Sequence, residues 1–228
     1  MYAGALGDNA VERYALFLTS LELSADVEER RLALTRAREH GLDMEKVAIA
    51  TAERTIEKSF EILPPNKGPL PSIIALQPPA TEAETLLLRS IEWTTFLEGT
   101  YDTALEQANV TLRYFLGMLS TNPHCGFGLT AYLCLLGAGR IQVATTLLSM
   151  LPAELASISE PEECAMEYLH YRQFFNIWET LARIVECQAL ELQHMSKDTR
   201  AAWLKDYVVC FISKFTFLSM LRLAFRAS

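Results

Sequence analysis

The chain has 228 residues, of which 50% are hydrophobic and 21% are charged. This composition excludes intrinsic disorder as the main state, because disordered chains bury too little apolar surface to offset the entropy lost on ordering. The 28 acidic and 20 basic residues give a net charge of −8, which argues against a nucleic-acid binder with a basic surface. We expect no secretory signal, because the first residues lack a basic start followed by an apolar run.

Helix signals follow one another through the first quarter of the chain. Asp8 is expected to cap a first helix, and Asp26 begins a capping box before a second one, which ends at Gly41. Asp43 caps a third helix, which stops before Pro64 because proline lacks an N–H donor. The buried face of the first helix should carry the apolar residues at helical spacing, namely Val11, Tyr14, Ala15 and Leu18.

A proline-rich connection over residues 62–80 separates these helices from the next group. A second capping box begins at Thr81 and opens a helix that is broken at Gly99. Helix pairs with short loops, and almost no strand signal before residue 207, predict an all-α fold in the form of an irregular α-helical solenoid of stacked antiparallel helices. The further helices are expected from about Tyr101 to Phe115, Arg140 to Met150 and Glu162 to His194, followed by a short one that contains Trp203.

Two segments differ in composition from the rest. Residues 114–139 contain no charged side chain and hold five of the ten glycines. The last segment, residues 207–228, contains no acidic side chain and is apolar for about the length of a membrane helix. Lys214 and Arg222 interrupt that apolar run, and each would be costly in a bilayer.

Motifs for catalysis and cofactor binding are not found. The sequence has no phosphate-binding loop, dinucleotide-binding glycine pattern, H-E-x-x-H or nucleophile elbow, and its five cysteines form no C-x-x-C pair. The four histidines lie on different predicted elements, without a second ligand at metal spacing. We therefore expect no catalytic residue, no cofactor, no metal site and no small-molecule substrate.

Four aromatic residues share one face of the predicted long helix. A buried packing ridge is one interpretation, because aromatic side chains bury large areas between helices. Docking of a partner helix is another, and a nucleic-acid stacking platform is disfavoured by the acidic neighbours. As candidate partner-contact residues we select these four and a tryptophan further along, namely Tyr168, Tyr171, Phe175, Trp178 and Trp203.

Several motifs occur in a characteristic order. The block ERYALFLTSLELSADVEERRLALTRAREHGLDMEKVAIATAERTIE combines a Tyr-Ala-x-Phe-Leu helix with a helix that ends in a Gly-Leu-Asp turn. The runs LRSIEW and ALEQANVTLRYFL follow, and YRQFFNIWETLARI provides a later aromatic helix. In this order, over residues 1–117 and 138–206, the chain resembles an internal part of the nuclear pore protein 84/107 family.

The resemblance implies an α-helical stack that is incomplete at both ends and acts as architecture in the nuclear pore complex at the nuclear envelope. The implied partners are other scaffold nucleoporins of the Y-shaped subcomplex, with no direct nucleic-acid contact and only indirect membrane association. The implied role is to dock these partners through helical surfaces and so to support nucleocytoplasmic transport and mRNA export. The alternatives are a vesicle-coat-like adaptor, a helical enzyme with a carboxylate site, and a protein anchored in a membrane through residues 208–225.

The chain departs from the family pattern in the two unusual segments. Removing residues 118–137 restores the run Phe-Leu-Gly-Ala-Gly-Arg, and Gly117-Met118 can be encoded around a GTATG splice donor. We hypothesise that this segment is translated from a retained intron, and the rival interpretation is a genuine loop or apolar helix hairpin. We therefore expect a solenoid fragment over residues 1–206, with 62–80 as its proline-rich connection, and an atypical apolar tail over 207–228.

Overall fold

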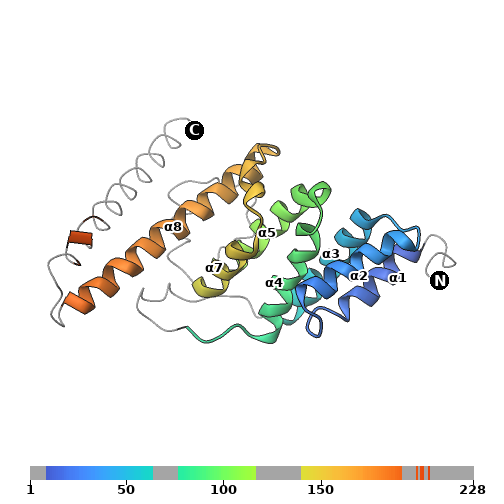
Figure 1. Cartoon of the computed structure of the whole chain (residues 1–228), viewed down its shortest axis with the longest axis horizontal. Coiled ribbons are helices and arrows are strands. Elements are labelled where there is room, and N and C mark those ends of the chain that lie inside the picture. The colour runs from blue at the N-terminus through green and yellow to red at the C-terminus, as the bar shows by residue number, and fades with distance from the viewer. Residues whose placement is uncertain are drawn as a thin grey trace. The chain divides into compact units, whose positions relative to one another are not determined.

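A computed structural model describes residues 9–63, 77–116 and 140–191, together with Thr199, Ala201, Ala202 and Lys205. Within these residues all regular structure is helical, with seven α-helices, two short 3-10 helices and no strand (Figure 1). The predicted all-α class is therefore confirmed. The segment 118–137, the tail 207–228 and most of the proline-rich connection lie outside the described residues.

The chain divides into two compact units. The first comprises Met1–Pro65, Pro79–Leu112 and Thr146–Met166, and the second comprises Asn66–Pro78, Arg113–Thr145 and Glu167–Ser228. Most described helices belong to the first unit.

The second and third helices begin and end at the residues that their capping signals indicate. Helix α1 spans Ala10–Thr19, α2 spans Val27–Glu39 and α3 spans Met44–Ile62. The Asp26 capping box forms, and the Asp43 carboxylate accepts the backbone N–H groups of the first turn of α3. Gly41 has φ +75°, the left-handed conformation expected just after a helix. The N-cap residue of α1 is Asn9, which makes no side-chain capping bond, and the expected cap, Asp8, lies outside the described residues.

The later helices also match their predicted ranges. Thr81 forms its capping box before α4, Glu82–Thr95, and the short helix η2, Glu98–Thr100, contains the helix-breaking Gly99. Helix α5 spans Tyr101–Leu116, α7 spans Ile141–Met150 and α8 spans Glu162–Glu191, with the 3-10 helix η3, Ala153–Ser157, before α8. The expected helix around Trp203 centres on a residue outside the described part of the chain, although Ala201 and Ala202 are helical.

The core of the first unit lies where α3 packs against α1, α2 and α4. Leu18, Leu34, Val47 and Trp93 are at most 1% exposed, and the expected buried face of α1 is present, with Ala15 and Leu18 fully buried. Burying each large apolar side chain contributes about 1.5–3 kcal/mol. Small residues on α3 line the same core, so that neighbouring helices approach it closely; they are Ala48, Thr51, Ala52, Thr55 and Ser59.

None of the described helices is both long enough and apolar enough to cross a membrane. The proposed membrane-anchoring segment, residues 208–225, lies outside the described part of the chain.

Candidate partner-binding surfaces

Helix α8 carries four of the five predicted partner-contact residues. Tyr168, Tyr171 and Phe175 are only 2%, 2% and 7% exposed, whereas Trp178 is partly exposed. The Trp178 ring lies 5.9 Å from the ring of Phe174. The burial of the first three agrees with the packing-ridge interpretation, and it leaves Trp178 as the accessible member of this group on the described helix. Trp203 lies outside the described residues.

Tyr171 belongs to an ion-pair cluster within the second unit. Its hydroxyl donates to Glu167 Oε1 at 2.7 Å, and Arg113 of α5 binds both oxygens of the same carboxylate. Glu167 is 5% exposed. Burial and the neighbouring Glu167 raise the pKa of Tyr171, and the hydrogen bonds to Glu167 raise the pKa of Arg113. Tyr171 therefore stays a neutral phenol at physiological pH, and the cluster joins α5 to α8.

Glu22 forms the centre of a buried polar cluster in the first unit. The side chain is 1% exposed, and its Oε1 accepts hydrogen bonds from Thr55 Oγ1 at 2.6 Å and from Trp93 Nε1 at 3.1 Å. Burial raises the pKa of Glu22 to about 7, although both hydrogen bonds and the nearby Arg30 oppose that rise. Glu22 thus connects the segment after α1 to both α3 and α4.

Arg30 extends this cluster to α2. Its guanidinium donates to the backbone carbonyl of Glu22 at 3.0 Å and forms an ion pair with Glu92 of α4. Arg89 donates to the same Glu22 carbonyl. Burial lowers the pKa of Arg30 and raises that of Glu92, because both charges are removed from solvent. The arrangement holds the α1–α2 loop against α4.

In both clusters the hydrogen-bonded polar atoms join one helix to another. Among the described residues no group of three or more histidine, cysteine or acidic side chains could hold a metal ion. Neither cluster was predicted from the sequence. For the Glu22 cluster the available signal was an acidic residue between two leucines, Leu21 and Leu23.

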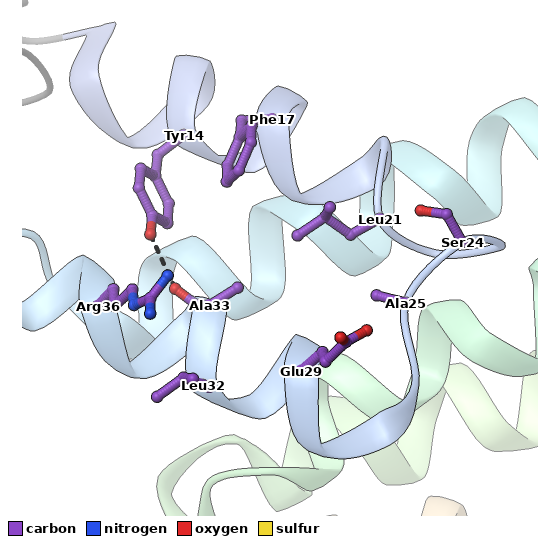
Figure 2. A pocket seen from close by; sticks show the side chains of 9 residues that line it. All are labelled: Tyr14, Phe17, Leu21, Ser24, Ala25, Glu29, Leu32, Ala33 and Arg36. Atoms are coloured by element: carbon purple, nitrogen blue, oxygen red, sulfur yellow. Dashed lines mark hydrogen bonds between the residues drawn. The ribbon is translucent and has the colours of Figure 1, made fainter.

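A surface groove runs between α1 and α2 (Figure 2). It has a volume of about 440 Å³. Phe17 on α1 and Leu32 on α2 line it, and each is 52% exposed. Tyr14 lies deeper, and its hydroxyl donates to the carbonyl of Ala33 at 2.8 Å, so that the two helices are joined beneath the groove.

The fold and these clusters define an all-helical protein in which the buried polar groups hold helices together. The family model described as nuclear pore protein 84 / 107 matches residues 1–209, and the chain belongs to this family. It is thus a nucleoporin of a family whose role is structural, at the nuclear pore complex of the nuclear envelope. The matched range includes the segment 118–137. No curated protein matches the chain.

Proposed function

We propose that the chain is a structural scaffold component that docks other nucleoporins of the Y-shaped subcomplex through its helical surfaces. The observation that carries this proposal is the family match over residues 1–209. In this role the chain supports nucleocytoplasmic transport and mRNA export indirectly, by holding partners in place. Its helices are stacked as an α-solenoid, and it needs no substrate turnover, cofactor or direct contact with nucleic acid.

The buried polar clusters support a scaffold role in physical terms. Removing one partner of a buried ion pair leaves an uncompensated charge, so a pair that joins two helices disfavours arrangements that separate them. Arg113 and Glu167 fix α5 against α8, and Arg30 and Glu92 fix α2 against α4. A protein held in this way presents its outer side chains at constant positions, which reduces the ordering cost of docking.

Affinity capture of the tagged full chain tests the proposed partners. Quantitative mass spectrometry should find subunits of the Y-shaped subcomplex in a constant ratio to the chain after washing at increasing salt. Recovery of vesicle-coat subunits in their place would support the alternative adaptor and contradict the proposal. Capture of the chain alone would also contradict it.

We further propose that the α8 aromatic group and Trp203 contact a partner, with Trp178 as the accessible member on α8. Trp178→Ala should weaken capture of the pore subunits several-fold without changing the cooperativity of unfolding. Leu169→Ala is the matched control, because Leu169 is a 41% exposed apolar residue of the same helix. Equal capture by both variants and the unchanged chain would show that this face makes no contact.

We also propose that residues 118–137 are translated from a retained intron and that 207–228 is an atypical tail outside the solenoid. The absence of charge from 118–137, and the run Phe-Leu-Gly-Ala-Gly-Arg that its removal restores, support the first point. Sequencing mature transcripts tests it. A shorter message lacking these codons is expected, and a message that always contains them would show that the segment is native.

A further inference from the structure

The groove between α1 and α2 is lined by one stripe of side chains from each helix. On α1 the stripe holds Tyr14 and Phe17, which are three residues apart. Leu21 continues the stripe beyond the end of the helix, seven residues after Tyr14. On α2 it holds Leu32 with Ala33 beside it. Residues at spacings of three, four and seven share one helix face, so two such stripes side by side form the surface against which a third helix packs.

The charged side chains of the groove stand at opposite ends of the α2 stripe. Glu29 and Arg36 are seven residues apart, which corresponds to about 10 Å along the helix axis. Within the described residues the Arg36 guanidinium makes no hydrogen bond or ion pair. Glu29 uses Oε2 to accept the Asp26 N–H of the capping box, and its Oε1 is left without a hydrogen bond in that part of the chain.

We propose that this groove binds an amphipathic helix of another nucleoporin, whose apolar stripe covers Phe17 and Leu32 and whose acidic side chain pairs with Arg36. The inference rests on the proposed scaffold function, and it specifies one docking surface and the chemistry of its partner. A basic side chain two turns from the acidic one would lie near Glu29. The half-exposed Phe17 and Leu32 supply the apolar contact, and the two end charges set the register of the bound helix.

The test uses two fluorescent helical peptides of about 18 residues, a length that covers the groove with a turn to spare at each end. Both carry leucines at spacings of three and four. The mixed peptide has Glu and Lys two turns apart, and the basic peptide has Lys at both positions. Fluorescence anisotropy with the full chain should show the mixed peptide binding about threefold to tenfold more tightly, as an exposed ion pair allows. The net charge of −8 acts in the opposite direction, because it favours the basic peptide.

Arg36→Glu should reverse this preference. Arg38→Glu is the matched control, because both arginines are exposed in the last turn of α2 and only Arg36 lines the groove. Leu32→Ser should weaken binding of both peptides about tenfold, since it removes a large part of the apolar contact. Ile62→Ser, at a 60% exposed residue outside the groove, should leave both affinities unchanged.

An unchanged peptide preference in Arg36→Glu would overturn the proposal, as would full binding by Leu32→Ser. A concentration-dependent dimer that Leu32→Ser converts to a monomer would show that the occupant is a second copy of the chain. Displacement of the mixed peptide by a peptide of residues 207–228 would identify the chain's own tail as the occupant, and both outcomes contradict a nucleoporin helix. Capture of pore subunits by the unchanged chain is scored separately, so that failure of the groove and failure of the scaffold function are distinguishable.

Discussion

Replacement of Glu22 by glutamine should remove a specific pH dependence of stability. The buried carboxyl has its pKa raised from 4.5 to about 7, so between these values the folded chain binds more protons at this site than the unfolded chain. The stabilisation from the protonated group is therefore complete at low pH and is lost as the pH rises through the folded pKa. The amide introduced by Glu22→Gln is neutral at every pH, and its oxygen can still accept from Thr55 and Trp93.

The magnitude follows from the displacement of the pKa. The rise in the pKa of Glu22 from 4.5 to about 7 corresponds to about 3 kcal/mol of unfolding free energy, at 1.36 kcal/mol per pKa unit. Between pH 5 and pH 8 the unchanged chain should lose about 2–3 kcal/mol of unfolding free energy relative to Glu22→Gln, because part of the interval lies below pH 5.

Urea unfolding at several pH values from 5 to 8 measures this difference. A Trp178→Phe, Trp203→Phe background leaves Trp93, which is fully buried and bonded to Glu22, as the fluorescent reporter. Glu12→Gln is the control for removal of an acidic side chain, because the Glu12 side chain is 60% exposed. Parallel stability curves for Glu22→Gln and the unchanged chain would refute the assignment of a raised pKa to Glu22.

The remaining stability predictions concern local features. Thr81→Ala should cost about 1 kcal/mol in urea unfolding, because it removes the cap of α4, and a loss below about 0.3 kcal/mol would show that the capping box contributes little. Gly41→Ala should cost about 1–2 kcal/mol, although no atom lies within 4 Å of the added Cβ, because φ is +75°; an unchanged midpoint would contradict this reasoning. Arg113→Met should cost about 2 kcal/mol by leaving the buried Glu167 without its cation, measured with Trp178 as the reporter, and a neutral effect would show that the pair adds no net stability.

The helix boundaries could be read from the sequence because their signals are local. The side chains of Asp26 and Thr81 accept backbone N–H groups three residues away. Gly41 is favoured at its position by its own positive φ angle. Nothing outside a single turn is needed to recognise such a cap. This locality explains why the expected helices match the described ones within a few residues.

The Glu22 cluster could not be predicted in this way, because it joins residues 33 and 71 positions apart in the chain. The buried face of α3 was also only partly visible in the apolar pattern. Thr51 and Ser59 are buried there, and each hydroxyl donates to the carbonyl four residues earlier. A hydroxyl satisfied within its own helix can be buried at low cost, so a search for apolar periodicity alone misses it.

For the aromatic residues of α8, too, the local pattern could be predicted from the sequence and the contacts with distant residues could not. Spacing alone placed Tyr168, Tyr171 and Phe175 on one face, and they are all buried. What covers that face depends on distant segments, as does the contact of Tyr171 with Glu167 and Arg113. Spacing therefore predicted the shared face, and the packing decided that Trp178 is its accessible member.

The central claim is that this chain is built into the nuclear pore scaffold. Its most direct test is super-resolution imaging of the full chain, tagged at its own locus, together with a marker of the pore. The account predicts a punctate nuclear rim in which the tagged chain coincides with individual pores. A diffuse signal, or a signal on vesicles with no enrichment at the pores, would contradict it.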